Sequence, residues 1–363
     1  LRNYCHDIIT RMFDSDTSLS SSSDEEIERI PRRRNLKNRT NPFEIFDEQE
    51  FKMRFRFQKQ TVLWLTDLIG GDLRPQTRRR QPISELNQIL LTLRFLATGT
   101  FQQVIGDLFG VHKSTACVII QRVVRKIAEL KPHYIQMPTP EELQSIKLKF
   151  YRLRRMPRVI GAIDGTHIRI QSPGGPQAEI FRNRKGYFSI NCQAVCDADL
   201  KIRNIVARWP GSVHDSTIFN DSSLCARLEN GEYGEDFLVG DSGYACRPFL
   251  LTSLVNPRTP GEQAYNDAHK ATRNPIERCF GVLKRRFPCL SVGLRTKMDT
   301  TLATIVACAV LHNIAIMAKD DEPPVDPAVH IPQEVEVEPA HIRENHHNEN
   351  TAVRNVLIRT HFN

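Results

Sequence analysis

Three carboxylates stand where the folded chain could bring them together. Asp164 ends the apolar run of VIGAIDGTHIRI, and Asp241 ends a second apolar run within DFLVGDSGY. Glu277 follows Asp241 by 36 residues (277 − 241), inside the helical stretch NPIERCFGVLKRRF. A buried carboxylate is costly unless it is paired or binds a cation. Magnesium and manganese prefer carboxylate and water oxygens, and a pair of such ions about 4 Å apart can promote phosphodiester hydrolysis.

Each of these residues also has a purely structural interpretation. Asp164 and Asp241 both precede glycine-containing turns, and either carboxylate could simply form its turn. Asn274, Pro275 and Glu277 fit an Asn N-cap, a proline at the first helical position and a glutamate at the third, which is a capping box. That pattern predicts a helix start at Pro275, and capping would compete with metal binding for Glu277.

The elements that would position these residues follow one another between residues 158 and 318. Alternating and apolar runs predict strands at 159–170, 187–197, 201–211 and 236–241, with a helix over 213–230 before the last strand and a long helix after it. That order matches an α/β fold of the ribonuclease-H-like type, a mixed sheet with flanking helices. In this arrangement, carboxylates at neighbouring strand ends converge with one from a helix. Asp215 begins the intervening helix, where acids usually only complement the helix dipole.

An all-helical N-terminal domain is predicted over residues 41–131. Helical periodicity indicates helices over 44–56 and 58–69, the second ended by the Gly70-Gly71 pair and Pro75, and a further helix that Gly99 ends. Two more helices, 101–109 and 114–129, are joined by a tight turn and resemble a helix-turn-helix. Hydroxyls near the start of the second helix and cations further along suit a DNA groove and its phosphates. An ordinary helical hairpin is the alternative, and we favour DNA contact largely because of the rest of the chain. The predicted contact residues are Ser114, Thr115, Arg122, Arg125 and Lys126.

The remaining segments complete the predicted domain organisation. Residues 1–40 and the acidic 319–363 have the composition of disordered tails, and 132–157 reads as a connecting segment. The basic run 32–34 fits either a nuclear-import signal or a solvated tail. The longest apolar run, 302–318, is interrupted by His312 and Asn313, so we predict a core helix and no membrane segment.

The charge of the chain favours anionic partners without identifying them. The 363 residues carry a formal charge of +8, yet many basic proteins bind no nucleic acid. A basic cluster of Lys284, Arg285 and Arg286 follows Glu277 on the same predicted helix. We predict that this cluster holds phosphates of a DNA backbone beside the carboxylates.

Five ordered motifs resemble the catalytic domain of PIF/Harbinger-type DDE transposases, above all its domesticated animal branch. They are GAIDGTHI, WPGSVHDSTIF, GDSGY, NPIERCFGVLKRRFP and LHN. The resemblance implies that Asp164, Asp241 and Glu277 are the DDE ligands of a divalent cation, Mg²⁺ or Mn²⁺, and that Asp215 is a further acid at the metal site. It also implies a nuclear protein, which could also be present in the cytoplasm, and a Myb/SANT-like DNA-binding partner. A homo-oligomer is left open.

The leading hypothesis is therefore a transposase-derived, metal-dependent nuclease that cleaves DNA. The alternative from another class is a catalytically silent DNA-binding scaffold that kept the fold and works with the Myb/SANT-like partner. A small-molecule phosphohydrolase fits poorly with the basic helical domain.

Overall fold

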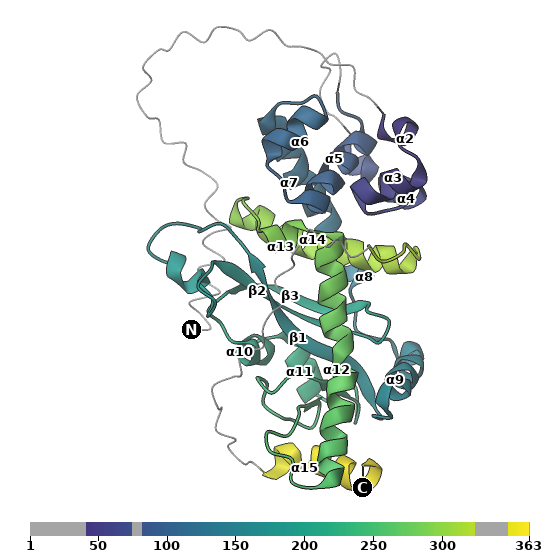
Figure 1. The fold of residues 1–363 in the computed structure, drawn as a ribbon, viewed down its shortest axis with the longest axis vertical. Coiled ribbons are helices and arrows are strands. Elements are labelled where there is room, and N and C mark those ends of the chain that lie inside the picture. The colour runs from purple at the N-terminus through teal and green to yellow at the C-terminus, as the bar shows by residue number, and fades with distance from the viewer. Residues whose placement is uncertain (1–40, 75–81, 324–347, 363) are drawn as a thin grey trace.

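The computed structural model describes residues 41–74, 82–323 and 348–362 (Figure 1). The predictions of a disordered tail over residues 1–40, of an import signal at 32–34 and of a helix end at Pro75 lie outside these residues. So does most of the predicted acidic tail, residues 324–347.

Short helices make up the first part of the described chain, and local signals set many of their ends. Asp47 and Ser84 cap two of them through their side chains, and Gly99, with φ +65°, ends the helix that Ser84 begins. A Cβ at Gly99 would lie 2.9 Å from the Cα of Cys289, so this close approach also requires glycine. Contrary to the sequence prediction, one helix runs through Gly70 and Gly71 to Leu73. The helices are α2 (Pro42–Ile45), α3 (Glu48–Phe55), α4 (Lys59–Leu73), α5 (Glu85–Thr98), α6 (Gln102–Leu108), α7 (Lys113–Glu129), α8 (Lys131–Tyr134) and α9 (Pro140–Arg154).

A five-stranded mixed sheet follows, with the strand order β3-β2-β1-β4-β5. Its strands are β1 (Val159–Arg169), β2 (Ser189–Cys196), β3 (Ile202–Pro210), β4 (Phe237–Val239) and β5 (Leu250–Leu251). The first three strands form an antiparallel meander, whereas β4 runs parallel to β1 and β5 parallel to β4. The short helices between strands are η1 (Ala178–Phe181), α10 (Asp215–Asn220) and α11 (Ser223–Glu229). The predicted mixed sheet with flanking helices is thus observed.

One long helix, α12 (Pro260–Arg286), crosses the sheet (Figure 1). It begins at a capping box made by Thr259 and Glu262 and continues through Pro275. The prediction of a helix start at Pro275 is therefore wrong, and Asn274 is an interior residue. A proline inside a helix costs about 3 kcal/mol. The apolar face that α12 buries, from Tyr265 through Ile276 to Leu283, offsets that cost.

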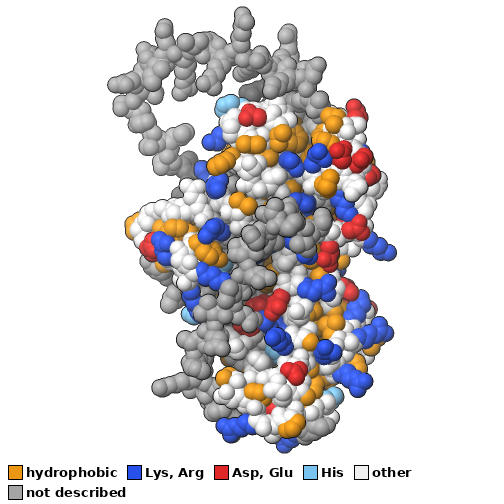
Figure 2. All heavy atoms as spheres, viewed as in Figure 1, with side chains coloured by type: hydrophobic (Ala, Val, Ile, Leu, Met, Phe, Trp, Pro, Cys, Tyr) orange, Lys and Arg blue, Asp and Glu red, His pale blue; other side chains and the backbone are white. Residues whose placement is uncertain are grey.

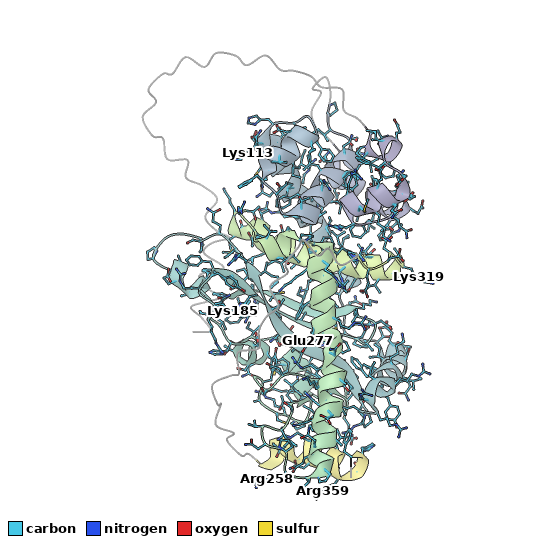
Figure 3. The ribbon with its side chains drawn as sticks, viewed as in Figure 1. Lys113, Lys185, Arg258, Glu277, Lys319 and Arg359 are labelled. Atoms are coloured by element: carbon cyan, nitrogen blue, oxygen red, sulfur yellow. The ribbon has the colours of Figure 1, made fainter. Side chains whose placement is uncertain are left out.

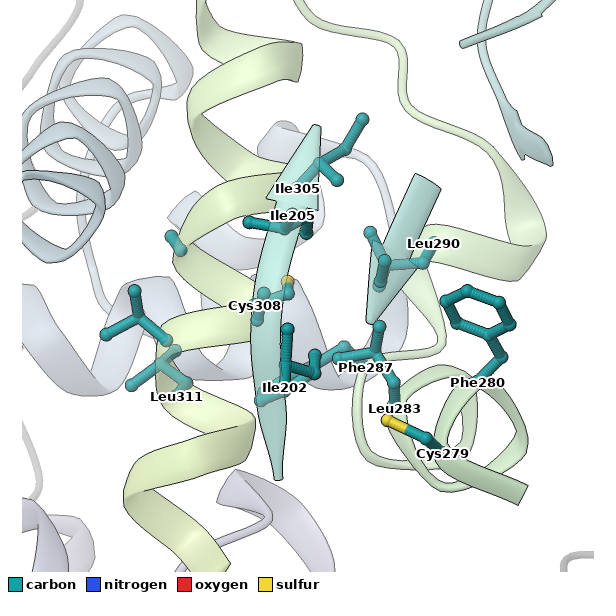
Figure 4. Packing of buried hydrophobic residues seen from close by; sticks show 14 of the residues in the cluster. Ile202, Ile205, Cys279, Phe280, Leu283, Phe287, Leu290, Ile305, Cys308 and Leu311 are labelled. Atoms are coloured by element: carbon teal, nitrogen blue, oxygen red, sulfur yellow. The ribbon is translucent and has the colours of Figure 1, made fainter. Parts of the chain in front are cut away.

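The helices after α12 join the sheet to the N-terminal helices. α13 (Cys289–Val292) packs against α5, and α14 (Met298–Met317) packs against both α7 and β3. Figure 4 shows side chains of α12, α13 and α14 meeting Ile202 and Ile205 of β3. Most buried apolar side chains of residues 51–127 belong to the same continuous cluster as part of the sheet, including Ile202 and Ile205, whereas Ile160, Ile163 and Leu238 belong to a second cluster. α14 is long and apolar enough to cross a membrane by composition, and 72% of its apolar window is buried inside the protein.

A last helix, α15 (Asn348–His361), packs against α12 and corrects the prediction of disorder across 319–363. Leu357 and Ile358 are buried, and the ring of Phe362 lies edge-on to Tyr265 of α12 at 5.8 Å between ring centroids. The buried Arg354 guanidinium donates to the carbonyl oxygens of Thr252 and Ser253. The acidic composition of the whole segment obscured this short amphipathic stretch.

We expect Leu357→Ala to lower the free energy of unfolding by about 2 kcal/mol or more, since the side chain is 4% exposed and its removal leaves a cavity. Val356→Ala is the matched control, because Val356 lies on the same helix and is 55% exposed. Denaturant unfolding of the two variants tests the packing of α15. Equal stabilities would show that this helix does not cover α12 in solution.

Candidate active site

The register of two parallel strands places Asp164 and Asp241 side by side. Ala162 of β1 pairs with Val239 of β4, so each aspartate lies two residues beyond the paired position on its own strand. The Asp164 carboxylate accepts from the Gly165 amide at 2.8 Å, and the Asp241 carboxylate accepts from the Gly243 amide at 3.0 Å. Asp241 thus makes the local turn contact that the sequence allowed, whereas β1 continues through Asp164 and Gly165 without a turn. The sheet brings the two aspartates together.

The electrostatics of Asp164 reflect this convergence. Burial raises the pKa of its carboxyl well above the ordinary value, and the negative charge of Asp241 raises it further. The nearby Arg273 opposes this rise in pKa, and Asp215 adds to it. A carboxylate that is desolvated and faces two others is an unfavourable anion unless cations surround it.

Asp215, at the first position of α10, belongs to the same cluster. A Cβ built on Gly165 would lie 2.2 Å from its Oδ1 atom, so the Asp215 carboxylate occupies the space where a side chain at 165 would be. The Asn191 side-chain amide donates to that Oδ1 at 2.7 Å. From the residue pattern alone, Asp215 was expected only to complement the dipole of its helix. Its place at the site was expected from the family resemblance. The glycine directly after Asp164 was the local signal for a close neighbour.

Glu277 is linked to Asp164 by Arg273, a residue that the sequence analysis did not identify as part of the site. The Arg273 guanidinium donates to Asp164 Oδ2 at 2.8 Å through Nη1 and to Glu277 Oε1 through Nη2. Its side chain is only 10% exposed, and it lies one turn before Glu277 on α12. Figure 3 shows Glu277 midway along this helix. Glu277 therefore has a partner other than the predicted helix cap, and the i, i+4 spacing from Arg273 was the available signal.

A buried polar layer on β2 supports the acids. The Gln193 side-chain amide donates to the Tyr244 hydroxyl and to the main-chain oxygen of Asp215, each at 2.9 Å. Burial raises the pKa of Tyr244, and all three aspartates add to this rise, so its hydroxyl stays protonated. Sequence reasoning missed Asn191, Gln193 and Tyr244. Two amide side chains on a strand that is otherwise apolar were the signal for a buried polar network.

The donor chemistry of this cluster suits a divalent cation that prefers oxygen ligands. Among the described residues, no three His, Cys, Asp or Glu side chains meet closely enough to hold a metal ion in the present conformation. The Arg273 guanidinium lies between Asp164 and Glu277 and donates to both. The carboxylates are suitable ligands for Mg²⁺ or Mn²⁺, and the Arg273 guanidinium bridges Asp164 and Glu277.

Lys and Arg side chains are spread over the visible face and do not gather in one patch (Figure 2), so phosphate contacts must be sought residue by residue. Arg286 is 2% exposed and donates to the main-chain oxygens of Arg56 and Asp321. Lys284 is buried and donates to Thr166 Oγ1 at 2.6 Å. The prediction that these two residues hold phosphates is wrong, because the fold uses both cations internally. Arg285 is half-buried and pairs with Glu322 at 3.2 Å.

The helix-turn-helix-like pair consists of α6 and α7, and its predicted contacts have different outcomes. Ser114 and Thr115 are exposed near the start of α7. Arg122 is not available for DNA, because its guanidinium donates to the Leu73 carbonyl oxygen and to the Gln88 side chain. Arg125 is exposed and lies 3.9 Å from a carboxylate oxygen of Asp299. Lys126 is engaged by carboxylates, at 2.9 Å from Glu129 and 3.4 Å from Asp72.

We expect Asp164→Asn to stabilise the metal-free protein at pH 8, because it removes a charge that burial and Asp241 disfavour. A carboxyl whose folded pKa is raised stabilises the fold below its unfolded value of 3.8, and this contribution is lost as the pH rises through the folded pKa. The advantage of Asn over Asp should therefore be largest at pH 8 and shrink toward pH 4. Thermal unfolding in a chelator at several pH values measures this difference in stability between the variant and the wild type. A variant less stable than the wild type at pH 8 would show that the attraction of Arg273 outweighs the repulsion.

Arg273→Gln should destabilise the metal-free protein by on the order of 2 kcal/mol, because it leaves the partly buried Asp164 without its cation. The half-exposed Glu277 contributes little to this figure. Arg278→Gln is the matched control on the same helix, since Arg278 is 61% exposed and lies 3.7 Å from Glu322. Chemical unfolding in a chelator compares the two variants. Equal losses would contradict the bridging role of Arg273.

Comparison with known proteins agrees with this geometry. The sequence profile of the DDE superfamily endonucleases matches residues 163–313. The chain is 36% identical over 325 residues to the Bos taurus protein named "Putative nuclease HARBI1", covering 88% of this chain and 92% of that protein. The Homo sapiens protein of that name is 35% identical over 277 residues, covering 75% and 79%.

A plant relative is more distant, and no solved structure matches the chain. Protein ALP1-like of Arabidopsis thaliana is 28% identical over 295 residues, covering 76% of this chain and 72% of that protein. The predicted family resemblance is thus confirmed on most of the length of the chain. The chain belongs to the Harbinger transposase-derived nuclease family of the DDE superfamily endonucleases.

Proposed function

We propose that this chain hydrolyses DNA phosphodiester bonds with two divalent cations, Mg²⁺ or Mn²⁺, at the site that Asp164, Asp241 and Glu277 define. The observation that supports this most is the shared register of Asp164 and Asp241 on neighbouring parallel strands. Asp215 lies against Gly165 beside them and is the fourth acid of the proposed site.

Each residue of the site has a distinct part in the proposed mechanism. Asp164 and Asp241 would hold the cations from the rigid sheet, and Glu277 would hold them from α12. Bound cations would activate a water and offset the charge that builds on the phosphate. Asn191 and Gln193 keep Asp215 in place through its carboxylate and its main-chain oxygen. Arg273 neutralises Asp164 and Glu277 when no cation does so.

The further elements of the proposal concern partners and location. Relatives named as nucleases and the exposed Ser114, Thr115 and Arg125 on α7 support DNA as the substrate. A Myb/SANT-like DNA-binding partner and a nuclear location, with some protein in the cytoplasm, follow from the family resemblance. Each is part of the proposal.

A second function has one observation in its favour. A DNA-binding scaffold without catalysis needs its clustered acids neutralised by the protein itself, and Arg273 pairs with two of them. A scaffold would bind DNA, alone or with the Myb/SANT-like partner, and never cut it.

Cleavage of supercoiled and linear DNA by the purified chain, with Mg²⁺ or Mn²⁺, separates the two functions. Asp164→Ala and Asp241→Ala should each lower the rate by more than about 100-fold, since even residues that only support a metal ligand cost about 10- to 100-fold. Asp199→Ala is the carboxylate control, because Asp199 is exposed, pairs with Lys149 and lies in the β2–β3 turn. Binding without cutting, also with the partner added, would establish the scaffold.

A further inference from the structure

The segment between β1 and β2, residues 170–188, ends in a tightly organised turn. We call residues 183–187 the Asn183 turn. The Asn183 side-chain oxygen accepts from the amides of Lys185 at 3.0 Å and Tyr187 at 3.4 Å. The Gly186 amide donates to the Asn183 carbonyl oxygen at 2.9 Å, and Gly186 has φ +82°. This local bonding fixes where the side chains of residues 184 and 185 emerge.

The Asn183 turn is also fastened to the sheet. Asn183 is buried, and its side-chain amide donates to Ser189 Oγ at the start of β2. The Arg182 guanidinium donates to the Gly186 carbonyl oxygen at 2.8 Å. The Ser212 amide, which follows β3, donates to the Ile180 carbonyl oxygen at 3.1 Å. A turn held in this way presents its side chains without a large ordering cost on binding.

Two cations project from this turn, and one of them contacts the residue that precedes Asp215. Arg184 is exposed, and its guanidinium contacts the imidazole of His214. His214 is the N-cap residue of α10 and directly precedes Asp215. The Arg184 guanidinium lies against both ring nitrogens of this imidazole. A cation therefore stands at the edge of the carboxylate cluster.

Lys185 adds a second charge next to the first. Its ammonium makes no hydrogen bond or ion pair with any residue in the described ranges, and it is exposed. Figure 3 shows Lys185 on the segment that projects beside the sheet, with Glu277 on the helix that crosses it. Lys284 and Arg286, which the sequence predicted to bind DNA, are by contrast buried and bonded within the fold.

We propose that Arg184 and Lys185 form a binding site for phosphates of the DNA backbone and seat the DNA strand beside the acidic cluster. This inference rests on the proposed function, since it concerns the same substrate. Arg184 offers a planar fork that matches a phosphate, and Lys185 offers an unengaged point charge. The ring of Tyr187 is covered by the Arg169 guanidinium at 4.7 Å, so the turn offers charge and not a surface for stacking bases. Binding at this site is therefore independent of DNA sequence.

The salt dependence of DNA binding tests this site without requiring cleavage. We expect the double variant Arg184→Gln/Lys185→Gln, measured in a chelator against a DNA duplex, to reduce the slope of log K against log salt by about 2. The charge-conserving variant Arg184→Lys/Lys185→Arg should keep the wild-type slope. Both variants should unfold at the wild-type temperature, because the substituted side chains are exposed.

The matched control neutralises two other exposed cations, Arg152 and Arg154 at the end of α9, which make no hydrogen bond or ion pair within the described part of the chain. Arg152→Gln/Arg154→Gln should leave most of the slope intact. An unchanged slope in the Asn183-turn variant, or an equal loss in the control, would overturn the inference while the wild type still cuts DNA. A wild type that neither binds nor cuts DNA would instead overturn the proposed function, and this inference with it.

Discussion

The fold is arranged around the mutual repulsion of clustered, partly buried acids and the Arg273 guanidinium that offsets it. Parallel pairing of β1 with β4 brings Asp164 and Asp241 together, and Gly165 admits Asp215 to the same place. Arg273 counters this concentration of negative charge only because α12 passes over the sheet without a break. The helix contains a proline at a cost in stability, and its continuity through that proline keeps Arg273 one turn from Glu277 and beside Asp164. A helix that restarted at Pro275 would uncouple Arg273 from Glu277.

Periodicity and apolar runs were enough to predict strands β1 to β4 along the chain and the place of Asp241 after β4, but they missed the short β5. They were not enough for α12, because the Asn274–Glu277 pattern satisfies local capping rules and only tertiary burial overrides them. Arg273 was missed for a similar reason. Its partner Asp164 lies 109 residues away in the sequence, and no local pattern reports that distance.

Charged side chains were the least predictable part of the site. Arg122, Lys284 and Arg286 look like surface cations in the sequence, yet each satisfies oxygen acceptors inside the fold. Their long apolar stems allow burial, and the carbonyl oxygens that accept from Arg122 and Arg286 belong to segments distant in sequence. In the sequence, Arg184 and Lys185 look the same as these three cations. Only the structure shows that they are exposed and that the hydrogen bonds of Asn183 hold their turn in place. A count of basic residues therefore says little about where a phosphate binds.

The packing of α15 on α12 has a consequence for how the chain is made. Because α15 follows every other described element, a ribosome synthesises it after the sheet and α12 have emerged, and domains generally fold as they emerge. Until then, the face around Tyr265 lacks the aromatic contact that Phe362 provides. A nascent chain at this stage would expose apolar surface and be a substrate for chaperones. A premature stop codon shortly before residue 348 would leave the four acids of the site in the chain, but the face of α12 around Tyr265 would stay uncovered.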